Sequence, residues 1–235
     1  MTISASSLIR RATDLIMDNT SVRWPVPELV RWLNDAQRAV VLVRPDAINR
    51  TATGTLIAGT RQSLDAMVLS PLPAKLIEIT RNMAATSAKK AVRLVPRQIL
   101  DAQQPGWHGI TPTVDVLHYM FDPRDPKTFY VYPPATALAQ LEIMYSGVPT
   151  DIAEPVDGSL YTAVVGNVSL PDVYANVLLD LILYRAYSKD AEFAGNATRA
   201  AGHYAAAVAS LGDEIKATLA VQPQMKPGMT ATAGA

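Results

Sequence analysis

Two carboxylates at the end of a long apolar run are the residues best placed to do chemistry. Asp190 and Glu192 lie in the stretch LILYRAYSKDAEFAGN, residues 181–196. Glycoside hydrolases use such a pair, but residues two apart on a helix diverge by about 200 degrees and could not share one substrate. We interpret Lys189, Asp190 and Glu192 as the solvated end of a helix. A hydrolase that cleaves glycans with carboxylates such as Asp172, Asp190 or Glu192 is the alternative hypothesis.

The glycine and histidine patterns predict neither a phosphate loop nor a metal centre. Gly54 and Gly59 in GTLIAGTR lack the lysine and the following helix of a phosphate-binding loop. We interpret them as part of a β-hairpin whose turn lies at Ala58 and Gly59. The histidines lack the spacing of paired metal ligands: His108, His118 and His203. We therefore predict no catalytic residue, no cofactor and no metal.

One cluster of basic residues lies in the middle of the chain, in the stretch KKAVRLVPR. It consists of Lys89, Lys90, Arg93 and Arg97. Basic side chains on one face can contact nucleic-acid phosphates, and basic side chains along an exposed strand also discourage edge pairing. Because no aromatic residues alternate with them, we favour a solvated edge. A DNA-facing surface stays open as the alternative.

Helical patterns at both ends of the chain enclose a middle part with the pattern of short strands. Apolar residues recur at three-and-four spacing in 8–16, after serines that can cap a helix. A second such stripe begins near Pro27, which suits a first turn, and ends before Pro45. Short β-prone runs separated by turn residues then fill 52–147, and those in LHYMFDPRDPKTFYVYPP predict a hairpin.

The helical period returns at Leu170, with Pro171 in the first turn, and Gly195 breaks it before an alanine-rich last helix. The fold class predicted is therefore α+β: a helical bundle of about four helices, from the N- and C-terminal parts, with a small antiparallel β-rich insertion. The expected segments are 1–50 (N-terminal helices), 51–166 (β-rich insertion), 167–220 (C-terminal helices) and 221–235 (a flexible tail without periodicity).

Composition favours a protein that covers its surface by assembling with other chains. The 235 residues are 49% hydrophobic and 18% charged, and acidic and basic residues balance at 21 each. Such a chain has no basic field for nucleic acid or an anionic membrane. It has no cysteine, which excludes disulfides and thiolate chemistry. No run of about 18 apolar residues is present either, so we expect no membrane span.

The ordered combination of several segments resembles head-to-tail adaptor (connector) proteins of tailed bacteriophages. These segments are RWPVPELVRWLNDAQRAVVLVRPDA (Arg23–Ala47), AGTRQSL, EITRNM and LPDVYANVLLDLILYRAYSKDAEFAGNATRAAGHYAAAVASLG (Leu170–Gly212). The resemblance implies a structural virion protein, not an enzyme, that forms a ring of twelve copies under the portal. The alternative stays a cytoplasmic or virion-associated hydrolase that cleaves glycans. The resemblance implies as partners the portal protein, a tail or nozzle protein and further copies of the chain. Genomic DNA would pass through the lumen, at the head–tail interface of a virion assembled in the host cytoplasm.

This resemblance assigns expected roles to two further sets of residues. The first set is expected at the interface with other copies or partners: Trp24, Trp32, Tyr184, Arg185, Tyr187, Lys189, Asp190 and Glu192. The second set is expected in a C-terminal segment that docks on the portal: Gln222, Met225, Lys226 and Met229. If genomic DNA touches the ring, the basic cluster at residues 89–97 is the expected contact.

Overall fold

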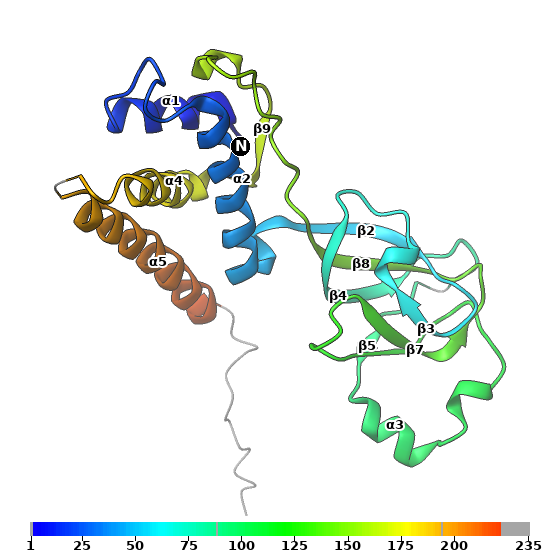
Figure 1. The fold of residues 1–235 in the computed structure, drawn as a ribbon. Helices are drawn as coiled ribbons and strands as arrows, with labels where there is room; N and C mark the ends of the chain where they lie inside the picture. The colour runs from blue at the N-terminus through cyan, green and yellow to red at the C-terminus, as the bar shows by residue number, and fades with distance from the viewer. Residues whose placement is uncertain (1, 88, 194, 222–235) are drawn as a thin grey trace, which may run out of the picture. The chain divides into compact units, whose positions relative to one another are not determined.

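The computed structural model describes residues 2–87, 89–193 and 195–221 (Figure 1). The chain divides into two compact units. The helical unit combines Met1–Val43 with Ile152–Ala235, and the strand-rich unit is Arg44–Asp151. Both ends of the chain therefore contribute to one core, and the strand-rich unit is inserted between them. The expected segment boundaries at residues 50, 166 and 220 stay a prediction.

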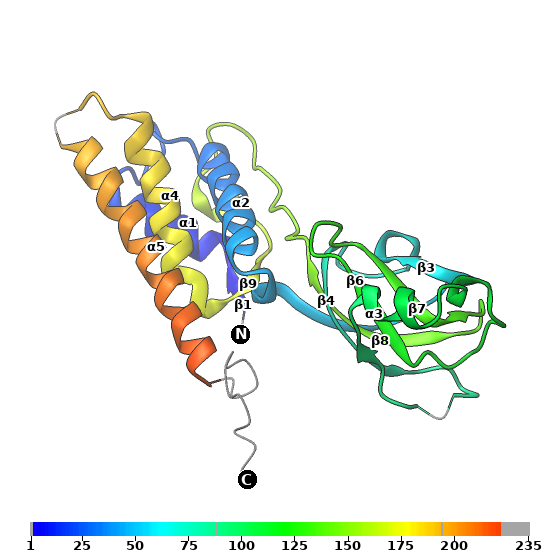
Figure 2. The same ribbon diagram turned by 90° about the horizontal axis from the view of Figure 1, so that it is seen from below.

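Helices dominate the first unit, with one small sheet beside them (Figure 2). Helix α4 packs against α5, α2 and α1, so it is covered on several sides. The antiparallel pair of β1 and β9 brings the start of the chain beside the segment that leads into α4. The elements are α1 (Ala5–Leu15), α2 (Val26–Val43), α4 (Ala175–Lys189), α5 (Asn196–Val221), β1 (Thr2–Ser4) and β9 (Asn167–Pro171).

The first two helices form where the sequence predicts them. The side chain of Ser4 caps α1 by accepting a hydrogen bond from the Ser7 N–H at 3.2 Å. Helix α2 has Pro27 in its first turn and ends at Val43, just before the residue that precedes Pro45. The predicted apolar stripes of both helices are buried, except for Leu15 at the end of α1, which is 54% exposed. Serine capping, proline and apolar spacing therefore account for these elements.

The predicted start of the third long helix is wrong. Pro171 ends strand β9, and a short 3-10 helix, η5 (Asp172–Tyr174), precedes α4. Proline fits there because its missing N–H and fixed φ also suit the end of a short edge strand. At the other end of α4 the predicted break is confirmed, since Gly195 has a φ of +85° just before α5 begins at Asn196.

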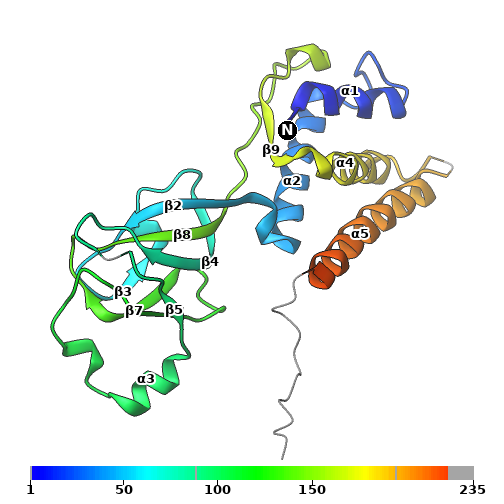
Figure 3. The same cartoon turned by 180° about the vertical axis from the view of Figure 1, so that it is seen from behind.

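Two sheets build the strand-rich unit (Figure 3). The three-stranded sheet has the order β2–β8–β4, and the four-stranded sheet has the order β3–β7–β6–β5. All neighbours are antiparallel except β5 and β6. Their apolar residues form one buried cluster that includes Leu76, Ile79, Phe129, Val131, Leu141 and Ile143. The elements are β2 (Asn49–Thr55), β3 (Gly59–Ser63), β4 (Pro73–Asn82), β5 (Arg93–Leu94), β6 (His118–Phe121), β7 (Thr128–Ala135), β8 (Gln140–Gly147) and α3 (Arg97–Gln103).

Of the two predicted hairpins, one is confirmed and one is wrong. Strands β6 and β7 pair directly, as predicted. Strands β2 and β3 are not paired, because β2 joins β8 in one sheet and β3 joins β7 in the other. The turn between them, the β2–β3 corner, carries the chain from one sheet to the other. It is held by the buried Gln62, whose amide makes hydrogen bonds of 2.8 and 2.9 Å with the backbone of Ile57 and 3.1 Å with the carbonyl of Gly59.

The α+β class is confirmed, but its predicted arrangement is only partly right. The described residues form five α-helices, one of which, α3, belongs to the strand-rich unit. The helical unit also contains a sheet, so the predicted bundle of about four helices is not confirmed. The strand-rich unit takes up nearly half of the chain, which is more than a small insertion. Strand pairing between distant segments, which local periodicity does not report, accounts for the difference.

Candidate assembly interface

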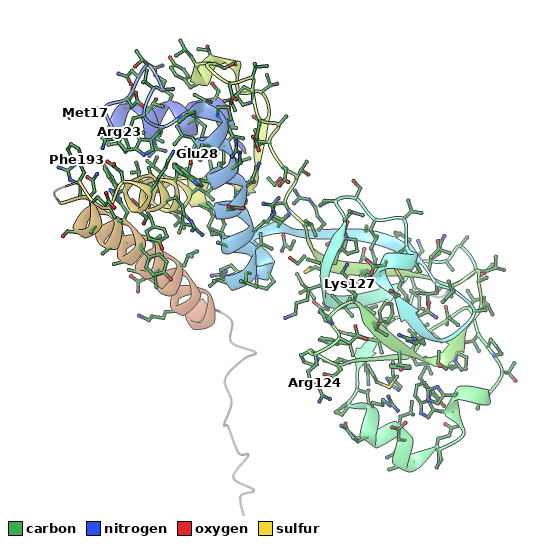
Figure 4. All side chains as sticks on the ribbon, in the orientation of Figure 1. Met17, Arg23, Glu28, Arg124, Lys127 and Phe193 are labelled. Carbon is green, nitrogen blue, oxygen red and sulfur yellow. The ribbon has the colours of Figure 1, made fainter. Side chains whose placement is uncertain are left out.

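A hollow at one end of the helical unit lies among several of the residues expected at an interface. It is about 370 Å³ in volume and lies where the α1–α2 connection meets the α4–α5 turn. Figure 4 shows Met17, Arg23 and Phe193 at this end of the unit. We call it the tip hollow, and its lining includes Ile16, Met17, Arg23, Trp24, Phe193 and Arg199.

Two of the expected interface aromatics, Trp24 and Tyr187, are buried inside the helical unit. The Trp24 indole N–H donates to the carbonyl of Ala186 at 3.1 Å. The Tyr187 ring stacks on His203 with centroids 5.7 Å apart, and that imidazole is hydrogen-bonded to Asp180 at 2.9 Å. These contacts fasten the α1–α2 connection and α5 to α4. If Trp24 and Tyr187 affect assembly, they do so by fixing the shape of the helical unit.

The charged residues at the end of α4 are paired within the unit. The carboxylate of Asp190 accepts hydrogen bonds from the guanidinium of Arg23 and, at 2.9 Å, from the side-chain amide of Asn196. The ammonium of Lys189 forms an ion pair with Glu28 in the first turn of α2. These pairs tie the end of α4 to the start of α2 and position the residues around the tip hollow.

A second, shallower depression contains the exposed aromatic residues of the expected interface. It has a volume of about 110 Å³ and is lined by residues of α2, α4 and α5 that include Trp32, Leu181, Tyr184, Arg185 and Tyr204. The rings of Tyr184 and Tyr204 are 5.1 Å apart, and the Arg185 guanidinium lies 5.6 Å from the Tyr184 ring centre. We call this the aromatic groove. Aromatic rings beside arginine are typical of contacts that carry binding energy between proteins.

The carboxylates of the hydrolase hypothesis lie on three different segments. Asp172 is exposed in η5, Asp190 is paired at the end of α4, and Glu192 is exposed in the α4–α5 turn. The carboxylate of Asp190 is already engaged by Arg23 and Asn196 within the unit. Among the described residues no group of three or more His, Cys, Asp or Glu side chains could hold a metal ion.

The basic cluster follows one edge of the strand-rich unit, and all four of its residues are exposed. Lys89 and Lys90 lie in the connection after β4, Arg93 lies in the edge strand β5, and Arg97 begins α3. The buried amide of Asn82 fixes this segment, because its backbone and side-chain N–H groups both donate to the carbonyl of Lys90 at 3.0 Å. We call these four residues the basic strip; within it, Arg97 also pairs with Asp101 at 3.1 Å.

A third hollow, of about 560 Å³, lies in the strand-rich unit between α3 and the β6–β7 connection, and Arg97, Asp101, Asp122 and Arg124 are among its lining residues. Arg124 lowers the pKa of Asp122 to about 2. The indole N–H of Trp107, with help from Arg97, lowers the pKa of Asp101. Both carboxyls are therefore anions at neutral pH. Neither is held protonated as a general acid would be.

Several residues around the tip hollow were not predicted from the sequence. Met17 and Phe193 are 89% and 61% exposed, and Arg23 lies 4.5 Å from the centre of the Phe193 ring. Asp18 forms the connection by accepting hydrogen bonds from three backbone N–H groups, those of residues 22, 23 and 24. The run Asp-Asn-Thr-Ser at 18–21 is a turn signal that could have indicated this loop.

Comparison with known proteins gives one decisive match. The family model described as SU10 adaptor protein matches residues 3–229, which is nearly the whole chain. The chain belongs to the SU10 adaptor protein family. This confirms the resemblance to head-to-tail adaptors of tailed phages. No curated protein is significantly similar to the chain in sequence.

Membership in the SU10 adaptor family makes the chain a structural adaptor of a phage virion that works with other head–tail components. Within the described residues no helix is long and apolar enough to cross a membrane. The residues expected to dock on the portal, Gln222, Met225, Lys226 and Met229, lie outside the described residues. Their role is therefore a prediction from the resemblance alone.

Proposed function

We propose that this SU10 adaptor assembles as a ring of twelve copies under the portal and links the capsid vertex to the tail. The family match over residues 3–229 is the observation that carries the proposal. The genome passes through the lumen of the ring, and a tail or nozzle protein binds on the side away from the portal. The residues at 222–235 dock on the portal. Assembly takes place in the host cytoplasm.

The aromatic groove supports an interface between copies on the helical unit. Tyr204 is half exposed, and Trp32 and Tyr184 are partly exposed, so their rings retain apolar area that a neighbour can cover. Arg185 is exposed beside them and supplies a polar rim. Lys189, Asp190 and Glu192 extend this rim toward the tip. Burying aromatic area within a ring of charged residues is how stable interfaces concentrate their energy.

The exposed strip of Lys89, Lys90, Arg93 and Arg97 is the surface we assign to the passing genome. Contact with phosphates there is independent of sequence, as passage of a whole genome requires. Replacing the first three of these residues by glutamine should lower the slope of log affinity for duplex DNA against log salt by about 3, since each phosphate contact contributes about 0.9. A slope equal to that of the unaltered chain excludes DNA contact by this strip.

The mass of the purified chain, alone and mixed with the portal of the same phage, tests the proposal. Light scattering should show a discrete ring-sized complex in at least one sample. Arg185→Glu and Glu192→Lys should each reduce the complex while the monomer keeps its melting temperature. Arg61→Glu, an exposed position on β3, is the matched charge reversal that should leave assembly intact. A monomer in both samples would refute the ring.

A further inference from the structure

The tip hollow has a backbone that is held in an unusual conformation. Met17 and Ser21 have φ angles of +57° and +54°, a region that side chains other than glycine rarely adopt. The Asp18 carboxylate compensates by accepting the backbone N–H groups of Val22, Arg23 and Trp24 at 2.8–3.1 Å. Strained backbone held by dedicated hydrogen bonds is common at binding sites.

This conformation leaves apolar side chains exposed around the hollow. Met17 and Phe193, which line the hollow, are 89% and 61% exposed. The Phe193 side chain lies under the Arg23 guanidinium, which is in turn paired with Asp190. An apolar rim that is fixed in place on two separate segments, the α1–α2 connection and the α4–α5 turn, is suited to receiving another apolar side chain.

One cation of the hollow is available to a partner. Arg23 is paired with Asp190. Arg199 lies 5.7 Å from the centre of the Tyr187 ring. No carboxylate of the described residues forms an ion pair with Arg199. A partner that fits the tip hollow therefore presents an apolar side chain with a carboxylate beside it.

The chain itself carries such a segment on the helical unit. Residues 156–159 form a turn in which the Ser159 N–H donates to the Val156 carbonyl at 3.1 Å and Gly158 has a φ of +82°. Val156 is 81% exposed and Asp157 is exposed beside it. We call residues 156–159 the acidic turn. Nearby Glu154 already pairs with Arg31, so Asp157 is the carboxylate that the turn can offer.

The tip hollow and the acidic turn lie on different sides of the helical unit. The connection between β8 and β9, which contains the acidic turn, passes on the side of α2 remote from the α4–α5 turn in all three ribbon views (Figures 1–3). A head-to-tail contact between identical chains needs two different, complementary surfaces that face away from each other. One protomer could therefore use its turn while its own hollow receives the turn of the next.

We propose that the acidic turn of one copy docks in the tip hollow of another copy of this chain. Val156 packs against Met17 and Phe193, and Asp157 pairs with Arg199. The inference rests on the proposed assembly of several copies and adds to it a contact separate from the aromatic groove. We choose a second copy of this chain as the occupant because the chain carries both oppositely charged residues of the contact, Asp157 and Arg199.

Site-directed cross-linking tests the contact directly, since the chain has no cysteine of its own. Chains carrying Val156→Cys and chains carrying Phe193→Cys are mixed, with and without portal, and oxidised. A disulfide between the two kinds of chain is expected. Val173→Cys is the matched control, because Val173 is 75% exposed beside Asp172 on the same unit and should not cross-link to position 193.

Charge exchange gives a second, independent readout. Arg199→Glu and Asp157→Arg should each raise the protein concentration needed for half-assembly by about tenfold, and the double variant should recover most of the loss. Asp172→Arg is the matched control and should have no effect. Melting curves identify any variant that fails to fold, and Asp157→Arg changes only an exposed turn.

Each outcome supports or overturns the docking of the acidic turn, the adaptor ring, or both. Cross-links between positions 156 and 193, together with rescue by the double variant, support the docking of the acidic turn. Normal ring-sized complexes without these cross-links, or cross-links from position 193 to the portal instead, overturn the docking but leave the adaptor ring in place. Monomers and no cross-link, with and without portal, overturn both. Cross-linked chains that never form a ring support the contact and refute the ring.

Discussion

Replacing Asn82 should strongly destabilise the strand-rich unit. Asn82 is fully buried at the end of β4. Its side-chain N–H groups donate to the carbonyls of Lys90 at 3.0 Å and Val116 at 2.8 Å, and its carbonyl accepts the N–H of Val116 at 2.8 Å. One amide thus joins three segments of the chain, including the one that carries the basic strip.

The size of the effect follows from these bonds. Asn82→Ala removes three hydrogen bonds, each contributing about 1 kcal/mol to the free energy of unfolding. It also leaves the N–H of Val116 buried without its partner, which adds about 1 to 2 kcal/mol. We expect a total loss of about 4 to 5 kcal/mol. Asn82→Asp should be at least as harmful at pH 7, because a carboxylate would face two carbonyl oxygens.

Hydrogen exchange of the Val116 amide reports this loss at the site. Its exchange should accelerate by about 100-fold or more, since each 1.4 kcal/mol corresponds to about a factor of ten. Urea unfolding should give the same free-energy difference. Asn49→Ala, at an exposed position of β2, is the control and should change stability by less than about 0.5 kcal/mol. An Asn82→Ala chain as stable as this control would refute the reasoning.

Three further substitutions test contacts in both units. Trp24→Phe removes the indole bond to Ala186 and should cost about 1 to 2 kcal/mol in urea unfolding; an unchanged midpoint would contradict it. Arg124→Gln should raise the pKa of Asp122 from about 2 toward its ordinary 3.8, measured by NMR titration of the carboxyl. Because that folded pKa is depressed, the stabilisation from this pair is present above about pH 4 and is lost as the pH falls toward 2. Gln62→Leu removes three bonds to the β2–β3 corner and should cost about 2 to 4 kcal/mol in urea unfolding, while a loss below about 0.5 kcal/mol would show that the corner holds without it.

Local signals predicted the elements that local physics determines. The serines before α1 and the prolines around α2 act within a few residues of themselves, so capping and φ restriction can be deduced from the sequence. The β6–β7 hairpin was equally accessible, because its strands are separated by a short connection rich in proline and aspartate. Pairing over such short distances costs little loop entropy.

The missed features depend on partners far along the chain. Strand β9 forms because it pairs with β1, at the start of the chain. No residue pattern near Pro171 indicates this partner. Asn34 and Gln37 interrupt the apolar stripe of α2, where a pattern analysis treats polar residues as outward-facing. Instead they are buried, and bond the backbone of Ile152 and Ser169 at 2.8–3.0 Å.

The expected interface residues illustrate the same limit and lead to a more specific view of assembly. The sequence indicated that charge gathers near Lys189 and Asp190, but not that both are paired to the start of α2 and to Arg23. Those pairs hold Phe193 and the tip hollow in position before any partner arrives. Pre-positioned side chains lose less entropy on binding, so a contact made there is stronger for the same buried area. Asp190, one of the two carboxylates that first suggested a catalytic pair, is therefore part of the framework that holds the tip hollow in position.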